Sequence, residues 1–198
     1  MWIKICGLTT PEAVAAALAA GADAIGFVFA RSVRQVDPTT ARELARPARG
    51  RARCVAVTRH PSQDEVDEIL RVFEPDVLQT DATDLPGLRL PAQLDLLPVL
   101  RATPAAGQLP ARLLFEGAVS GAGQSCDWTQ ARALARQTQL VLAGGLNPAN
   151  VADAIMQVLP FGVDVSTGVE ARPGLKSPLA IEQFVTAARK GCRAEVES

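Results

Sequence analysis

The sequence lacks the features that would assign it to a nucleic-acid-binding, membrane-spanning or secreted class. Of 198 residues, 20 are basic and 21 are acidic, so the formal net charge is −1 and gives no electrostatic case for nucleic acid or an anionic membrane as a partner. No apolar run reaches the roughly eighteen residues of a membrane span. No basic and apolar leader is present at the start. A cytoplasmic location is therefore expected.

Cysteine and histidine are also scarce. The four cysteines (Cys6, Cys54, Cys126 and Cys192) lie far apart and form no C-x-x-C pair. This spacing argues against a zinc site and against a disulfide framework, so we expect reduced thiols and no metal. The single histidine, His60, follows an apolar run in a loop, where we expect it to be a bystander.

What the chain does contain is enough apolar material for one core. Hydrophobic residues make up 48% of the sequence, and at this length a single domain over residues 1–198 is the simplest organisation. We expect the polar tail, residues 193–198, to be disordered.

Short apolar runs alternate along the chain with amphipathic segments. Eight runs are typical of strands: Trp2–Cys6, Ala24–Phe29, Cys54–Val57, Val77–Leu78, Leu96–Leu100, Leu113–Phe115, Leu140–Ala143 and Gly162–Val165. Segments with helical spacing lie between several of them: Pro11–Ala20, Thr39–Ala45, Gln63–Phe73, Trp128–Arg136, Pro148–Val158 and Ser177–Arg189. Eight strands in this order favour a closed (β/α)₈ barrel, near-minimal because such barrels usually have about 250 residues. An open doubly wound sheet is the alternative.

Two connections predict degenerate helices. Leu85–Pro91 and Thr103–Pro110 contain too much proline and glycine for full helices. We therefore expect a truncated fourth helix and a loop in place of the fifth.

The first strand ends in a cysteine. Cys6 is separated by a single glycine and one leucine from the threonines that open the first helix, with Pro11 and Glu12 in its first turn. The carboxyl ends of parallel strands are where reactive groups lie in this fold class, so Cys6 is the first candidate for chemistry.

The last two strands end in glycine-bearing loops. Gly144 and Gly145 follow the seventh strand, and Ser166, Thr167 and Gly168 follow the eighth. In (β/α)₈ barrels these two loops commonly form a phosphate site, because glycine lets backbone N–H groups approach the phosphate oxygens and the hydroxyls add donors. The sequence therefore predicts a phosphorylated small-molecule ligand.

Four motifs of the chain are distinctive: Lys4–Thr9, Gly26–Phe29 with Ser32 and Arg34, Gly144–Pro148, and Asp164–Glu170 with Pro173 and Gly174. Together, from residue 2 to about residue 187, they resemble the phosphoribosylanthranilate isomerase family of tryptophan biosynthesis. The resemblance implies a barrel that catalyses an Amadori rearrangement, an aldose–ketose isomerisation of N-(5-phosphoribosyl)anthranilate to 1-(2-carboxyphenylamino)-1-deoxyribulose 5-phosphate. It implies no cofactor, and it leaves a homodimer open.

The resemblance also implies which groups carry the acid and base chemistry. The family's base is the cysteine of the opening motif, here Cys6, which must be biased toward thiolate; Lys4 is expected to lie too far along the strand to help. The family's acid is an aspartate that ends strand six, and Glu116 takes its place, reaching one methylene further. Glu116 would need a raised pKa to hold a proton. Asp127 is the rival carboxylate, expected to be an N-cap.

Three further residues match substrate-binding positions of the family. Arg34 corresponds to the arginine that holds the anthranilate carboxylate, and its planar fork suits that group; the neighbouring Arg31 is expected to be a solvated loop charge. Asp164 corresponds to the aspartate on the anthranilate amine side. Gln79 corresponds to the glutamine of the fourth strand, although Asp81 stands where the family has histidine.

Thr58 and Ser177 also depart from the family pattern. Two other functions therefore remain open: another sugar-phosphate barrel enzyme, such as an epimerase or a histidine-pathway isomerase, and a phosphate-binding barrel that has lost catalysis. The histidine-pathway enzyme usually has catalytic aspartates on strands one and five, and no acid is present at Val99–Ala102.

Overall fold

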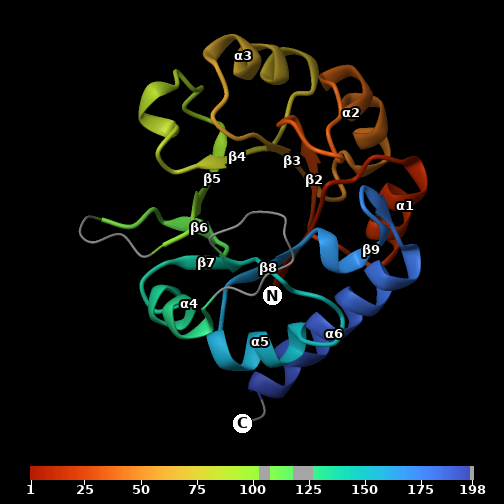
Figure 1. The fold of residues 1–198 in the computed structure, drawn as a ribbon, viewed down its shortest axis with the longest axis vertical. Helices are drawn as coiled ribbons and strands as arrows, with labels where there is room; N and C mark the ends of the chain where they lie inside the picture. The colour runs from red at the N-terminus through yellow and green to blue at the C-terminus, as the bar shows by residue number, and fades with distance from the viewer. Residues whose placement is uncertain (103–107, 118–126, 197–198) are drawn as a thin grey trace.

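Eight parallel strands close into a barrel, as the alternation of segments predicts. The computed structural model describes residues 1–102, 108–117 and 127–196. Its barrel strands are β1 (Trp2–Cys6), β2 (Ala24–Val28), β3 (Arg53–Val57), β4 (Val77–Asp81), β5 (Asp95–Leu100), β6 (Arg112–Phe115), β7 (Gln139–Leu142) and β8 (Gly162–Val165). β1 pairs with both β2 and β8, so the sheet has no edge and the open doubly wound alternative is wrong. Figure 1 shows the ring of strands with the helices outside it.

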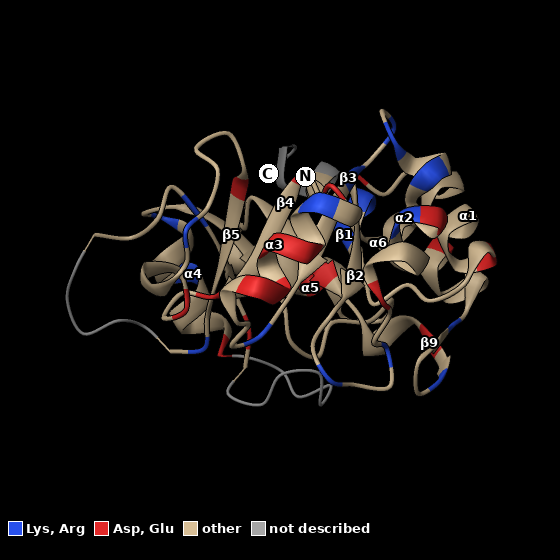
Figure 2. Ribbon diagram, turned by 90° about the horizontal axis from the view of Figure 1, so that it is seen from above, with Lys and Arg blue, Asp and Glu red and all other residues tan. Residues whose placement is uncertain are grey.

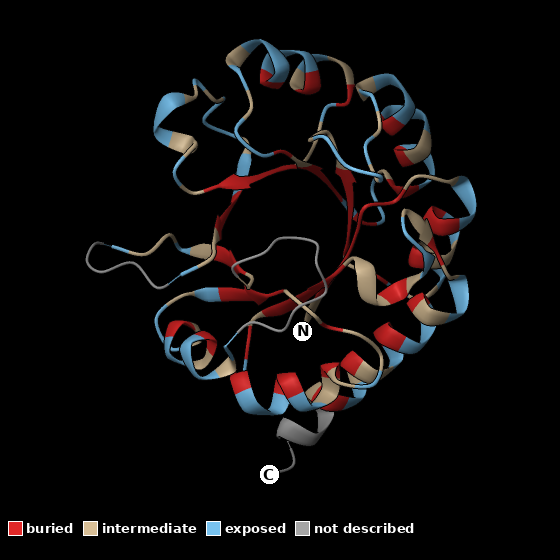
Figure 3. Ribbon diagram, viewed as in Figure 1, coloured by how far each residue is buried: buried red, intermediate tan, exposed pale blue. Residues whose placement is uncertain are grey.

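Helices cover most of the outside of the ring (Figure 3). They are α1 (Pro11–Ala19), α2 (Pro38–Ala45), α3 (Gln63–Val72), α4 (Trp128–Ala135), α5 (Val151–Val158) and α6 (Pro178–Val196). Short 3₁₀ turns lie at η1 (Arg46–Ala48), η2 (Leu85–Gly87) and η3 (Thr167–Val169), and a two-stranded hairpin joins β9 (Glu170–Arg172) to β10 (Leu175–Lys176). No described helix combines the length and the apolar character of a membrane span.

The expected weak connections have the expected form where they are described. The turn η2 is all that stands in the place of a fourth helix. The fifth connection contains no helix in its described part, and its residues 103–107 lie outside the described part. Cys126, which precedes α4, also lies outside it.

Helix caps explain where most helices begin. Thr10 accepts a hydrogen bond from the Ala13 amide at the start of α1, and Ser62 forms a reciprocal capping box with Glu65 at the start of α3. Asp127 accepts from the Thr129 amide, so its expected role as an N-cap is confirmed.

One of the expected boundaries was wrong. The helix expected from Pro148 begins at Val151, because Asn147 accepts the Ala149 amide in a turn of its own. The helix α6 extends to Val196, and residues 197–198 lie outside the described part, so the expected disorder of the tail stays a prediction.

Side-chain alternation along the strands builds two apolar layers. One lies between the strands and the helices and includes Ile3, Ile5, Leu78, Phe115 and Val163. The other fills the barrel interior: Ala24, Val55, Val77, Leu97, Val99, Leu114, Val141 and Ala143. Since every second residue faces inward, the inward positions nearest the carboxyl ends of the strands surround one mouth of the barrel.

Acidic and basic residues are interspersed along the ribbon (Figure 2), as the nearly balanced charge implies.

Candidate active site

The mouth at the carboxyl ends of the strands collects the candidate residues. Cys6 ends β1, Gln79 and Asp81 end β4, Glu116 follows β6, and Asp164 is on β8. Each occupies an inward position of its strand, because its sequence neighbours pack in the outer layer. The fold therefore brings together, at one end of the barrel, ionisable groups that are far apart in sequence.

A buried ion pair lies directly beneath Cys6. Lys4 Nζ is 2.8 Å from Asp164 Oδ1, and the two residues are register partners across β1 and β8. The Lys4 side chain is fully buried. Burial alone would lower the pKa of Lys4, but the charges of Asp164 and Cys6 raise it to about 12, so Lys4 stays protonated.

This geometry corrects the expectation that Lys4 is too far from Cys6 to help. The positive charge of Lys4 acts on Cys6 and favours its thiolate. Two residues along a strand span about 6.6 Å, a distance that the extended lysine side chain itself covers. Gly26 on the neighbouring strand leaves the room, since a Cβ there would lie 3.1 Å from Cys6 Sγ and 3.2 Å from Lys4 Nζ.

Burial nevertheless dominates the ionisation of Cys6. It raises the pKa of the thiol above its ordinary value, and the cations Lys4 and Lys176 offset only part of that increase while Asp164 adds to it. The thiol is thus the main form at neutral pH, and the thiolate increases as the pH rises.

Gly7 brings the loop after β2 and the loop after β8 close to Cys6. It has a φ of +75°, and a Cβ at this position would lie 2.7 Å from Arg34 Cδ and 3.2 Å from Ser166 Oγ. Only glycine fits here without displacing backbone or side chains. Arg34 and Ser166, both expected to bind substrate, therefore lie against the residue that follows the cysteine.

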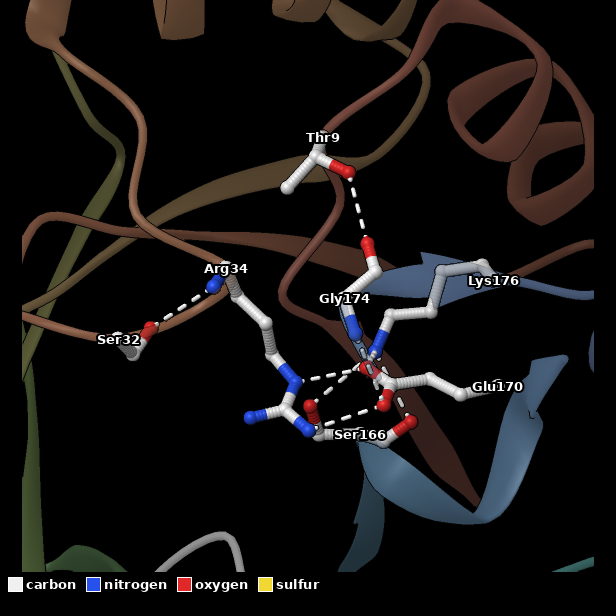
Figure 4. A network of polar contacts seen from close by, with 7 residues as sticks. All are labelled: Thr9, Ser32, Arg34, Ser166, Glu170, Gly174 and Lys176. Atoms are coloured by element: carbon white, nitrogen blue, oxygen red, sulfur yellow. Dashed lines mark hydrogen bonds and ion pairs between the residues drawn. The ribbon is translucent and has the colours of Figure 1, made fainter. Parts of the chain in front are cut away.

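Glu170 joins these two loops to the β9–β10 hairpin (Figure 4). Its carboxylate accepts Arg34 Nε at 2.6 Å and Nη2 at 2.9 Å, and it also accepts Lys176 Nζ at 2.8 Å. Lys176 Nζ donates in addition to the Ser166 carbonyl at 2.9 Å. Burial would raise the pKa of Glu170, but its hydrogen bonds with Arg34 and Lys176 lower it, so the carboxylate remains ionised.

The two glycine-bearing loops are in direct backbone contact. Gly144 and Gly145 have positive φ angles of 85° and 67°. A Cβ at Gly168 would lie 1.9 Å from the Leu146 carbonyl oxygen, so the loop after β8 packs on the loop after β7 with no space for a side chain. Thr167 opens the short turn η3 beside Gly168.

Gln79 presents an unused polar atom toward the interior. The side chain is 7% exposed, and its Oε1 has no hydrogen-bond partner among the described residues. A buried acceptor without a partner is destabilising by itself, so this atom suits a ligand that brings a donor.

Glu116 lies on a different side of the mouth from Cys6, three strands away around the ring. Arg101 Nη2 is 2.8 Å from Glu116 Oε1, and Arg101 Nη1 contacts Asp81 Oδ1. An arginine beside a carboxylate favours the ionised form, which opposes the raised pKa that the sequence argument required of this acid.

His60 makes polar contacts with two neighbouring carboxylates, and its expected lack of a functional role stays a prediction. Its Nδ1 lies 2.8 Å from Asp84 Oδ1, and its Nε2 lies 3.6 Å from Asp81 Oδ2. These three residues are a described group whose ligand atoms lie within 4.8 Å of one another. Asp81 already pairs with Arg101 and faces Arg59 at 3.9 Å, and these cations oppose a metal ion there.

A cavity of about 380 Å³ lies between the loops after β2 and β3, away from Cys6 and Glu116. Phe29, Thr58 and Ile69 are among its lining residues. Arg59 and His60, which face Asp81, also line it, so the cavity borders the Asp81 side of the mouth.

Sequence reasoning missed three residues of this site: Arg101, Glu170 and Lys176. Glu170 lies within a motif already quoted, and the hairpin that carries Lys176 follows it directly. Arg101 continues the inward alternation of Leu97 and Val99, which is the one signal that marks it.

The barrel and its mouth define the class of (β/α)₈-barrel enzymes, whose active sites lie at the carboxyl ends of the strands. The family model for N-(5'-phosphoribosyl)anthranilate (PRA) isomerase matches residues 3–187, and the chain belongs to this family.

Three relatives show how far the similarity extends. The N-(5'-phosphoribosyl)anthranilate isomerase of Rhizobium leguminosarum bv. trifolii is 41% identical over 205 residues, which cover 93% of this chain and 92% of the relative. The solved structure of TrpF from Jonesia denitrificans is 33% identical with a TM-score of 0.79, covering 97% of this chain and 98% of that one. A phosphoribosyl anthranilate isomerase solved in complex with reduced 1-(o-carboxyphenylamino)-1-deoxyribulose 5-phosphate is 27% identical with a TM-score of 0.75, covering 96% and 99%.

The contact between Lys4 and Cys6 predicts how the thiol reacts. Removing the cation in Lys4→Met should raise the pKa of Cys6 further and shift its alkylation by iodoacetamide to higher pH. Peptide mapping by mass spectrometry as a function of pH measures this for each cysteine. Cys54, whose pKa burial raises to about 11, serves as the internal reference. The exposed Lys190→Met is the matched control, and an equal profile for both variants would contradict the coupling.

The contact between the two glycine loops predicts a severe effect of one methyl group. Gly168→Ala must displace the Leu146 carbonyl, so we expect it to lower the melting temperature and to weaken inorganic phosphate binding together. Gly87→Ala, where a Cβ meets nothing within 4 Å, is the control. Thermal denaturation with and without phosphate measures both effects, and a Gly168→Ala protein that matches the control would rule out the close packing.

Proposed function

We propose that this chain catalyses the Amadori rearrangement of N-(5'-phosphoribosyl)anthranilate in tryptophan biosynthesis, with Cys6 as the base and Glu116 as the acid. Membership of the isomerase family supports the reaction. The observation that carries the assignment of the base is the position of Cys6 at the end of β1, facing the barrel mouth beside the Lys4 ammonium. The reaction needs proton transfers only, which ionisable side chains supply.

In the proposed sequence Glu116 protonates the ribose ring oxygen, the bond from this oxygen to C1 breaks, and the nitrogen lone pair forms the Schiff base. The Cys6 thiolate then removes the proton from C2, giving an enolamine. Tautomerisation of the enolamine to the ketone yields the 1-deoxyribulose product. Lys4 stabilises the thiolate, and Asp164, its ion-pair partner, is proposed to face the anthranilate amine.

The phosphate is proposed to bind at the loops after β7 and β8, through amides of Gly144, Gly145 and Gly168 and the hydroxyls of Ser166 and Thr167. Their backbone contact favours a preformed site. Gln79 is proposed to accept a hydrogen bond from the sugar through its unpaired Oε1.

Arg34 is proposed to bind the anthranilate carboxylate. Two of its nitrogens contact Glu170, and its third points away from Glu170 toward the open side of the network (Figure 4). Glu170 thereby fixes the plane of the guanidinium while leaving donors for a ligand.

The cellular location in the cytoplasm, the organisation as one domain and a possible homodimer remain predictions. A small phosphorylated molecule is the proposed partner. A barrel that binds phosphate without catalysis is the competing function, suggested by the departures at Asp81, Glu116 and Ser177. Growth of a tryptophan auxotroph that lacks the isomerase, with this chain supplied, decides between the two; failure to grow with a folded, expressed protein would favour the competing function.

The assignment of the acid predicts that Glu116→Gln lowers kcat about 100-fold or more, because the amide keeps the shape of the side chain but has no proton to donate. Product formation by the purified variant, measured by chromatography, gives kcat. Asp127→Asn is the control, since asparagine caps a helix as well as aspartate and should leave turnover unchanged. An active Glu116→Gln with an inactive, folded Asp127→Asn would reverse the two roles.

The assignment of Arg34 predicts a loss in substrate binding. Arg34→Gln should lower kcat/KM by about 10- to 100-fold, mainly through KM, because a hydrogen bond to a charged group contributes roughly 1.5–3 kcal/mol. Arg31→Gln, at an exposed position of the same loop, should leave both constants unchanged. Steady-state kinetics of the two variants makes the comparison, and equal KM values would remove Arg34 from the substrate site.

A further inference from the structure

Two departures from the family pattern meet on one arginine. Asp81 ends β4 and Glu116 follows β6, and the family resemblance implies a histidine and an aspartate at these two positions. Arg101, which follows β5 between them, contacts both carboxylates, through Nη1 to Asp81 and through Nη2 to Glu116 at 2.8 Å. The two altered residues are thus physically linked.

The contact is built and partly buried. The Asp81 and Glu116 side chains are 10% and 14% exposed, and that of Arg101 is 23% exposed. The Arg101 Nε is buried without a hydrogen-bond partner among the described residues, so the contacts of the guanidinium lie on its two terminal nitrogens. A planar fork held at both ends by carboxylates has little freedom to rotate.

The charges of Arg101 and Asp81 act on Glu116 in opposite directions. Arg101 alone would hold Glu116 ionised and hinder proton donation. Asp81 is a second anion on the same guanidinium, and its charge favours the protonated form of Glu116.

We propose that Arg101 and Asp81 are positioning residues for the acid: Arg101 fixes the direction of the Glu116 carboxyl group, and Asp81 counterbalances its charge and sets the pH at which Glu116 ionises. The proposal rests on the proposed role of Glu116 in catalysis, but the electrostatic coupling can be measured without turnover.

Other charged groups reach this cluster from identifiable elements. Arg59 and His60, in the loop after β3, face Asp81 at 3.9 Å and 3.6 Å. β7, the strand on the other side of β6, ends at Leu142 and is followed by Ala143 and Gly144, which add no charge. Farther around the ring, β8 and β1 carry the Asp164–Lys4 pair. Among the described residues, Arg101 pairs directly with both Glu116 and Asp81.

Titration of the Glu116 carboxyl carbon by ¹³C NMR tests the coupling, with Glu116→Gln to assign the signal. Arg101→Gln should raise the pKa of Glu116 by about one unit or more, because the neighbouring cation is lost. Asp81→Asn should lower it, because Arg101 then acts on Glu116 alone. Opposite shifts of the Glu116 pKa in these two variants are specific to the proposed arrangement. If Arg101 and Asp81 had only a structural role, their replacement would not shift this pKa in opposite directions. Arg59→Gln, which removes a cation that faces Asp81 but is not paired with Glu116, is the matched control and should shift the signal least.

Kinetics tests the positioning. Arg101→Lys keeps the charge but cannot hold both carboxylates in one plane, so we expect kcat to fall about tenfold with KM nearly unchanged. The proposal would be overturned if the Glu116 pKa shifted in the same direction in Arg101→Gln and Asp81→Asn, or in neither variant. Circular dichroism identifies a variant that folds poorly, and the Glu116 pKa of the other variant still tests the proposal. An active Glu116→Gln with the opposite shifts intact would instead reject Glu116 as the acid and leave the coupling standing.

Discussion

The buried ion pair between Lys4 and Asp164 is the interaction on which the site depends. It joins the first strand of the barrel to the last, at the seam where the sheet closes. A buried pair of this kind adds little net stability, because desolvation offsets its Coulomb attraction. Its effect is positional: the pair holds a protonated amine beneath Cys6, where a thiolate needs a counter-charge.

Several cations lie close together around that seam, and a shared carboxylate offsets their mutual repulsion. Arg34 and Lys176 both lie near Cys6, and one carboxylate, Glu170, binds them both. Across the mouth the arrangement is inverted, with one arginine between two carboxylates. On the side of the base, one carboxylate, Glu170, is thus shared by two cations. On the side of the acid, one cation, Arg101, is shared by two carboxylates. In each arrangement a group of opposite charge lies between the two like charges.

The sequence predicted the fold well because the fold depends on local patterns. Apolar runs of two to six residues and helical spacing located the eight barrel strands and the six helices of the described residues, and proline and glycine located the degenerate connection at η2. The boundary that failed depended on a finer effect, the turn of Asn147 before α5. The candidate residues could be placed at the mouth because alternation along a strand fixes which side chains face inward. The sequence did not predict which side chains contact these candidates. Lys4 was rejected as a neighbour of Cys6 because only the spacing along the strand was considered and not the length of the lysine side chain. Arg101, the partner of Glu116, belongs to no recognisable motif.

The partners of the site are also separated by very long stretches of chain. Arg34 and Glu170 are 136 positions apart, and Lys4 and Asp164 are 160 apart. A ribosome therefore produces Lys4 and Arg34 long before it produces Asp164 and Glu170, the carboxylates that pair with them. Contacts of such range form late in folding, because the entropy of closing the loop must be overcome first. A nascent or half-folded chain consequently has an unpaired lysine at the position that closure will bury, so completion of the barrel and assembly of its chemistry are one event.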